Sequence, residues 1–137
     1  MPKGASVKTT AKLRGKTSLH LRIDFGPEQA LGPGKIRLLE LINETGSISA
    51  AGRALNMSYR QAWLLVDELN RMFSTPVVTA KIGGGGGGGA ALTETGNDIV
   101  RLYRDIERRA AGSAATEIRS LSKLLAAPIK PAPVESL

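Results

Sequence analysis

Residues 46–67 read GSISAAGRALNMSYRQAWLLVD, and this stretch decides the fold because its pattern is that of two helices joined by a tight turn. Ser47 is a suitable N-cap for a short first helix, since its hydroxyl can accept a hydrogen bond from a free backbone N–H. Asn56 follows that helix and tolerates the positive φ that the turn needs. Gly52 leaves space where one helix must cross the other at a steep angle. The stretch therefore predicts a helix-turn-helix.

The second of these helices has two distinct faces. Ser58 and Gln61 form the S-x-x-Q pattern of a capping box, which predicts that the helix begins there. The apolar positions at helical spacing are Ala62, Leu65, Val66, Leu69, Met72 and Phe73. The outward positions are Tyr59, Arg60, Trp63, Leu64 and Asp67. An outward face of this kind is typical of a recognition helix in the DNA major groove, and Arg60 is the leading candidate for a guanine or phosphate contact.

This outward face also fits other roles. Its aromatic and leucine side chains can pack under a neighbouring subunit, and Asp67 would repel phosphate. For Trp63, contact with DNA or a partner and packing in the core are equally compatible with the pattern. For Tyr59 and Arg60 we expect DNA contact, because they lie in the first turn of the helix, where its N-terminus favours phosphate.

The segment before the helix-turn-helix predicts one strand and one helix. Residues 19–25 alternate strictly, which predicts a half-buried strand with His20 on its solvent face and no partner ligand for that histidine. Residues 35–45 carry a broad apolar stripe and predict a helix that Gly46 ends. The expected inward residues of the strand are Leu19, Leu21, Ile23 and Phe25.

Seven consecutive glycines, residues 83–89, separate two short strand patterns at residues 77–82 and 91–93. We predict a hairpin, or wing, whose loop is the glycine run. A nucleotide-binding loop is excluded because Ala90 follows the run where Lys and Ser or Thr would be needed, and because a strand rather than a helix comes next. Glycines allow backbone N–H groups to approach phosphates closely, although a merely flexible tip is an equal alternative. The expected wing contacts are Lys81, Gly84, Gly85 and Gly86.

The last helical pattern starts at Thr93 or Thr95 and runs to about residue 127, with an expected bend or break at Gly112 and Ser113. Its apolar stripe has no evident partner inside so small a domain, so we expect a homodimer. The expected dimerisation residues are Ile99, Leu102, Tyr103, Ile106, Ile118, Leu121 and Leu125. The fold class expected is mainly α with a small antiparallel sheet: a winged helix-turn-helix plus a long C-terminal dimerisation helix.

Composition limits the chemistry. The 137 residues include no cysteine and one histidine, which leaves no thiol nucleophile, no disulfide and no evident metal cluster. No apolar run approaches 18 residues, so we expect no membrane span. We therefore expect a cytoplasmic protein that is not an enzyme and needs no cofactor or metal.

The net charge of +7 is concentrated at the N-terminus. Residues 1–26 hold six Lys or Arg against one Asp, whereas the rest of the chain holds thirteen basic against eleven acidic residues. Phosphate binding and simple solubility explain this charge equally well. The expected domains are a basic arm at 1–17, the DNA-binding domain at 18–94, the dimerisation region at 95–127 and a tail at 128–137.

Four short motifs carry a family resemblance. These are GSIS at 46–49, MSYR at 57–60, AW at 62–63 and LT at 92–93, the last following the glycine-rich wing and preceding Gly96. Over about residues 19–127 the chain resembles the N-terminal DNA-binding domain of the ModE family of molybdate-responsive regulators, and more distantly LysR-type regulators. The resemblance implies a winged helix that dimerises and places Ser58, Tyr59 and Arg60 against operator DNA.

Two departures from the family qualify what the resemblance implies. Family wings carry an Arg before the glycines and often a basic residue among them, whereas here Ala80 and Gly85 stand there, so weaker wing contacts are expected. The family's oxyanion-binding domains follow the long helix, whereas this chain stops about ten residues after Ala127. We thus expect no tight molybdate site in the chain itself, and any molybdate signal to arrive through a separate oxyanion-sensing protein.

The sequence therefore predicts a sequence-specific transcriptional regulator that binds palindromic double-stranded DNA as a homodimer and is linked to molybdate metabolism. The alternative is a winged-helix protein-interaction module that does not bind specific DNA.

Overall fold

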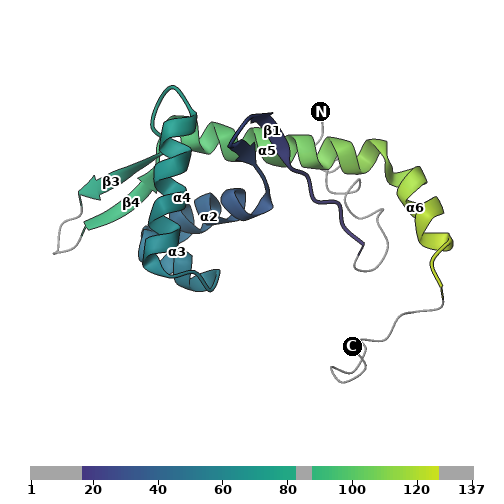
Figure 1. The fold of residues 1–137 in the computed structure, drawn as a ribbon, viewed down its shortest axis with the longest axis horizontal. Helices are drawn as coiled ribbons and strands as arrows, with labels where there is room; N and C mark the ends of the chain where they lie inside the picture. The colour runs from purple at the N-terminus through teal and green to yellow at the C-terminus, as the bar shows by residue number, and fades with distance from the viewer. Residues whose placement is uncertain (1–16, 83–87, 127–137) are drawn as a thin grey trace, which may run out of the picture. The chain divides into compact units, whose positions relative to one another are not determined.

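The computed structural model describes residues 17–82 and 88–126, and the chain divides into two compact units. One unit is His20–Ile106, and the other contains residues 17–19 and 107–126 of the described chain. The helices are α2 (Pro33–Thr45), α3 (Ile48–Ala54), α4 (Tyr59–Met72), α5 (Glu94–Ser113) and α6 (Ala115–Lys123). The strands are β1 (Ile23–Gly26), β2 (Gln29–Leu31), β3 (Val78–Ile82) and β4 (Gly88–Leu92). Helices thus dominate two small antiparallel sheets, which confirms the predicted fold class (Figure 1).

Local capping explains where α2, α3 and α4 begin and where α2 ends. Pro33 stands in the first turn of α2, where its missing N–H costs nothing, and Gly46 ends the helix in the left-handed conformation at φ 73°. The Ser47 side chain then accepts a hydrogen bond from the Ala50 N–H and caps α3. Ser58 caps α4 in the same way, as predicted.

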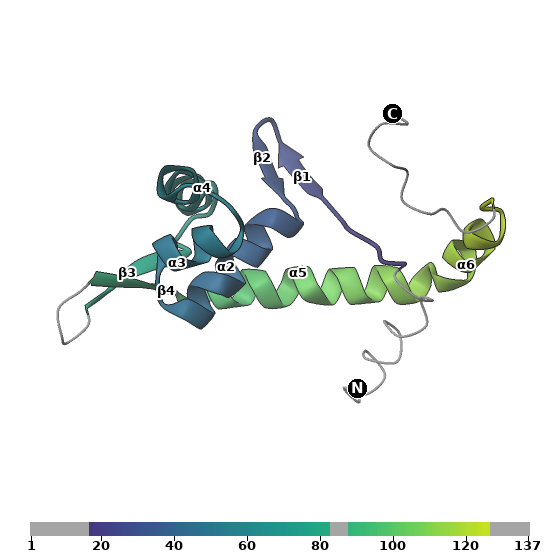
Figure 2. The ribbon, with the colours of Figure 1, turned by 90° about the horizontal axis from the view of Figure 1, so that it is seen from below.

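The core of the larger unit is formed where α2, α3 and α4 meet the wing strands and the first part of α5. Ile36, Leu38, Leu39 and Ile42 of α2 are completely buried. Around them lie further core residues, including Ala51, Ala62, Val66, Leu69, Val77, Ala90, Ile99 and Tyr103. Figure 2 shows α2, α3 and α4 gathered beside the wing.

The wing is a regular antiparallel ladder that runs from the pair Val78 and Leu92 to the pair Ile82 and Gly88. Gly88 and Gly89 therefore belong to β4, and the prediction that all seven glycines form the loop was wrong at this end. Gly89 suits the strand because a Cβ there would lie 2.8 Å from the Gly46 carbonyl oxygen. The same carbonyl accepts a hydrogen bond from the Ala90 N–H at 2.9 Å, so β4 is fastened to the end of α2.

The predicted strand over residues 19–25 was too long. Strand β1 starts only at Ile23, and its register with β2 shifts between Asp24 and Gly26. This irregularity breaks the alternation, so Phe25 is 56% exposed instead of buried. Leu21 lies outside the strand, and its carbonyl accepts a hydrogen bond from the Tyr103 hydroxyl at 2.6 Å.

Helix α5 begins with the predicted cap, because the Thr93 hydroxyl accepts a hydrogen bond from the Gly96 N–H at 3.0 Å. The predicted break is also present, since α5 ends at Ser113 and α6 starts at Ala115. In the smaller unit, Leu19 and Ile118 pack against Ala111 and Ala115. Within the described ranges, no helix is long and apolar enough to cross a membrane.

Candidate nucleic-acid interface

The geometry of the helix-turn-helix depends on one close approach. A Cβ built on Gly52 would lie 2.9 Å from the Ala62 Cβ, closer than two such carbons normally come. The Met57 N–H donates to the Gly52 carbonyl at 2.8 Å, and Asn56 adopts a φ of 59° in the turn. These contacts confirm the roles that the sequence predicted for Gly52 and Asn56, and they fix the angle at which α4 leaves the turn.

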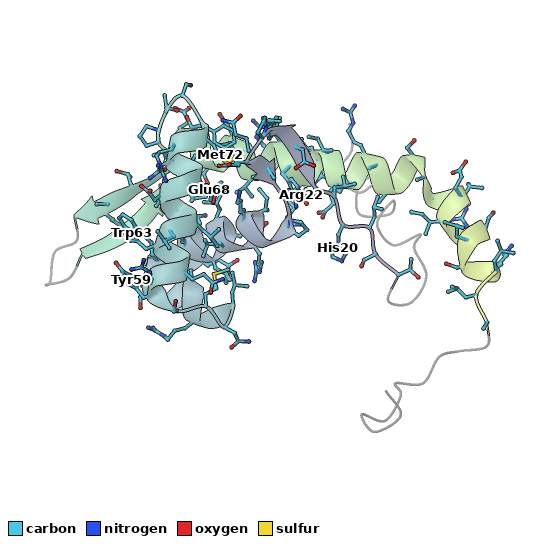
Figure 3. All side chains as sticks on the ribbon, viewed as in Figure 1. His20, Arg22, Tyr59, Trp63, Glu68 and Met72 are labelled. Atoms are coloured by element: carbon cyan, nitrogen blue, oxygen red, sulfur yellow. The ribbon has the colours of Figure 1, made fainter. Side chains whose placement is uncertain are left out.

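The start of α4 presents the predicted outward face to solvent. Tyr59 is 58% exposed and Trp63 is 46% exposed, and both lie along α4 in Figure 3. Arg60 and Gln61 are also exposed. Trp63 is therefore not a core residue, which decides one of the alternatives that the sequence left open.

The electrostatics of this face suit an anion. Ser58 occupies the Gln61 N–H at 3.0 Å, while the other amide groups of the first turn give the helix N-terminus its partial positive charge beside the Arg60 guanidinium. Farther along the face, Asp67 pairs with Arg71 at 3.0 Å. This pairing offsets the negative charge that would otherwise oppose a phosphate backbone.

The wing contributes Lys81, which is exposed on β3 opposite Gly89. The other predicted wing contacts, Gly84, Gly85 and Gly86, lie outside the described residues. A groove of about 220 Å³ runs between α4 and the wing, and its lining includes Trp63, Val66, Thr79 and Ala80.

Sequence reasoning missed two polar residues of this region. Arg53 is exposed in the last turn of α3 and donates to the Ser49 hydroxyl at 2.8 Å; the first helix of a helix-turn-helix crosses the DNA backbone, so a basic residue there suits phosphate. Asn70 hydrogen-bonds the backbone at Val77 and Val78. The sequence signal that could have identified Asn70 was an isolated amide side chain next to Leu69, a residue of the apolar stripe of α4.

A partly buried ion pair joins α5 to α2 inside the same unit. The Arg104 guanidinium donates to both carboxylate oxygens of Glu40, each at 2.9 Å. The hydrogen bond from Arg104 is the main cause that lowers the pKa of Glu40, and Arg37 adds to it, while partial burial opposes the shift. The pair holds α5 against α2.

The predicted dimerisation residues separate into two groups. Ile99 and Tyr103 are 8% and 1% exposed because they fill the core of the larger unit, so they offer no surface to a partner. Ile118 is half-buried in the smaller unit. The remaining four are exposed to solvent, namely Leu102, Ile106, Leu121 and Leu125.

The described residues hold no group of three or more His, Cys, Asp or Glu that could bind a metal ion. What they do hold is a helix N-terminus with an exposed basic and aromatic face and a β-ribbon beside it. The fold and this surface together define a class of protein, the winged helix-turn-helix DNA-binding domain. Residues 34–97 accordingly match the family of bacterial regulatory helix-turn-helix proteins of the lysR type. The matched range runs from α2 through the wing into α5.

The chain is also similar to individual proteins of known name. The chain is 41% identical over 92 residues to the molybdenum-pterin-binding protein MopB of Rhodobacter capsulatus, covering 67% of this chain and 34% of that protein. It is 39% identical over 87 residues to the molybdenum transport protein ModE of Azotobacter vinelandii, covering 64% and 32%. It is also 39% identical over 71 residues to the DNA-binding transcriptional dual regulator ModE of Escherichia coli, covering 52% and 27%.

These matches confirm the resemblance to the N-terminal part of ModE proteins that the motifs indicated. The chain spans about a third of the length of the curated relatives it matches.

Proposed function

We propose that this protein is a transcriptional regulator that binds palindromic double-stranded DNA as a homodimer. The observation that carries the proposal is the exposed first turn of α4, where Tyr59, Arg60 and Gln61 stand clear of the core at a helix N-terminus. Arg60 contacts a base edge in the major groove or a phosphate beside it, and Lys81 on the wing contacts the adjacent DNA backbone. Because such a regulator works on the chromosome, the proposal includes a cytoplasmic location.

The homodimer is proposed from exposed apolar side chains. Leu102 and Ile106 are 51% and 44% exposed on α5, and Leu121 and Leu125 are exposed on α6 and just beyond it. Burial of such exposed apolar side chains under a partner lowers the free energy of the assembly. A twofold dimer would carry two copies of α4 and would match a palindromic site.

The proposed link to molybdenum rests on the names of relatives, such as the molybdenum-pterin-binding protein MopB and the molybdenum transport protein ModE. We propose that the genes controlled by this chain serve molybdenum metabolism and that the 137-residue chain does not itself bind molybdate tightly. A calorimetric titration of the chain with molybdate tests the second point, and a saturable site of micromolar affinity would contradict it.

A protein-interaction module is the second candidate function. Tyr59, Trp63 and Leu64 are each about half exposed, and this apolar character on the outward face of α4 would also suit a protein partner. The two candidates differ in whether the chain prefers one DNA sequence.

Selection from a random DNA library, followed by affinity measurement on the enriched duplex, separates the candidates. Arg60→Ala is expected to weaken that binding by about 1–3 kcal/mol while the fold is retained. The matched control is Arg101→Ala, because Arg101 is an exposed arginine of α5 paired with Asp98. Absence of any enriched sequence would favour the interaction module, whereas equal affinities of wild type and Arg60→Ala for an enriched duplex would refute the role of Arg60.

A further inference from the structure

Asn70 connects the recognition helix directly to the wing. Its side-chain oxygen accepts hydrogen bonds from the Val77 N–H at 2.7 Å and the Val78 N–H at 2.9 Å. Its side-chain NH₂ donates to the Val78 carbonyl at 3.2 Å. A single side chain on α4 thus holds three backbone groups at the first residue of β3 and the residue before it.

The chemistry of these contacts requires an amide. Val77 and Val78 are 0% and 6% exposed, so their backbone groups have little access to water and are costly to leave unpaired. Asparagine offers an acceptor with two lone pairs and a donor on one short, rigid group. An alanine satisfies none of the three groups, and an aspartate satisfies only the two N–H donors.

A second tie holds the other strand of the wing. The Ala90 N–H of β4 donates to the Gly46 carbonyl at the end of α2, whereas Asn70 holds β3 to α4. Two ties on different strands and different helices fix the angle of the ribbon. Removal of the tie at Asn70 leaves the base of β3 held by the apolar packing of Val77 and Val78 in the core, without a directional contact to α4.

We propose that Asn70 is a positioning residue that sets the wing relative to the recognition helix, so that Lys81 reaches the DNA backbone while Arg60 occupies the major groove. The inference rests on the proposed DNA-binding function. It adds that wing contact depends on a residue that touches no DNA.

The first test measures position without DNA. The chain has no cysteine, so spin labels can be placed on introduced cysteines at two exposed positions only, Arg71 of α4 and Lys81 of β3. The labelled chain is mixed with an excess of unlabelled chain, so that a dimer carries at most one labelled protomer. Pulsed electron resonance is then expected to give one narrow distance distribution in the otherwise unchanged chain and a clearly broader one with Asn70→Ala. The matched control is Asn97→Ala, because Asn97 also donates from its side chain to a backbone carbonyl, that of Thr93, at the start of α5.

Asn70→Asp is a second variant, which keeps the test decisive if the alanine variant does not fold. It keeps the acceptor for both N–H groups and loses the donor, so an intermediate width is expected. Distributions that stay as narrow as that of the unchanged chain in every folded Asn70 variant would overturn the proposal.

The second test is a mutant cycle on the enriched duplex. Losing one phosphate contact lowers affinity about fivefold at 0.15 M salt and reduces the salt slope by about one. We expect Lys81→Ala to have this effect in the wild-type and Asn97→Ala backgrounds and none in the Asn70→Ala background. Arg60→Ala is expected to lower affinity by the same factor in all three backgrounds.

The outcomes are distinct. An equal cost of Lys81→Ala in all three backgrounds would show that Asn70 is only structural and would overturn the inference. Loss of both the Lys81 and the Arg60 effects in the Asn70→Ala background would also overturn it, because it would indicate general damage. A wild-type chain with narrow label distances but no sequence preference would instead refute the proposed function and, with it, the DNA half of the inference.

Discussion

Gly52 shows how one missing side chain controls the angle between two helices. Its backbone is helical, so the constraint is space and not conformation: any Cβ would press on the Ala62 Cβ at 2.9 Å, and neither carbon can rotate away. The two helices must separate to admit a side chain, and α4 then leaves the turn at a different angle.

We therefore expect Gly52→Val to lower the free energy of unfolding by about 2–3 kcal/mol, near the upper end of overpacking costs. Urea denaturation measures the change. Gly34→Val is the matched control, because a Cβ at Gly34 of α2 meets nothing within 4 Å, and a change within about 0.5 kcal/mol is expected there. Equal losses for the two variants would refute the role of the close contact.

The lowered pKa of Glu40 predicts how the free energy of unfolding changes in acid. Since Arg104 lowers the pKa of Glu40 in the folded chain, folding is favoured above the ordinary carboxyl pKa of 4.5, and this contribution is lost as the pH falls below that value toward the lowered one. We expect Glu40→Gln to cost about 1 kcal/mol at neutral pH and less as the pH falls from 5 to 3.

Denaturation curves over that pH range provide the measurement. Glu44→Gln is the control, because Glu44 is more exposed and lies 3.4 Å from Arg37. A Glu40→Gln curve parallel to that of the wild type at every pH would show that the ion pair has no part in acid stability.

At the level of helices and strands, the sequence predicted hydrogen bonds between residues close together in the chain. It missed contacts between different elements. Ser47, Ser58 and Thr93 cap helices within three residues of themselves, so their roles follow from local spacing. Phe25 was misplaced because its orientation depends on a register shift against another strand. Asn70 was missed because its partners lie seven and eight residues away, in the next element.

Helix α5 illustrates the same limit. Its sequence shows an apolar stripe but not which part of the stripe the domain itself covers, and Ile99 and Tyr103 are covered. Truncation before Ile99 would therefore remove part of the core and would not isolate an interface. A substitution of an exposed residue of the stripe is the cleaner experiment.

Leu102→Gln is expected to shift the protein from dimer to monomer in sedimentation equilibrium while the monomer stays folded, since Leu102 is 51% exposed in the single chain. Leu64→Gln is the matched control, because Leu64 is 48% exposed but lies on α4. A Leu102→Gln variant that sediments like the wild type would locate the interface elsewhere.

At the scale of the whole molecule, charge is distributed unevenly along the chain. Residues 1–16 hold five Lys or Arg and no acidic residue, so their contribution to binding is expected to be independent of DNA sequence. Deleting these residues should weaken binding to specific and random duplexes alike. The slope of log affinity against log salt should fall by as much as about four to five, at about 0.9 per phosphate released. An unchanged slope would exclude the arm from the complex.

The contacts that hold the wing also determine which changes of length the chain tolerates. The ties at Asn70 and Gly46 act on residues from the base to the middle of the ladder, so the pairing of β3 with β4 does not depend on how many residues join Ile82 to Gly88. Lengthening a connecting segment costs little free energy, about 0.6 kcal/mol for each doubling of its length. Glycine number between Ile82 and Gly88 is therefore expected to drift between lineages while the base of the wing stays constant.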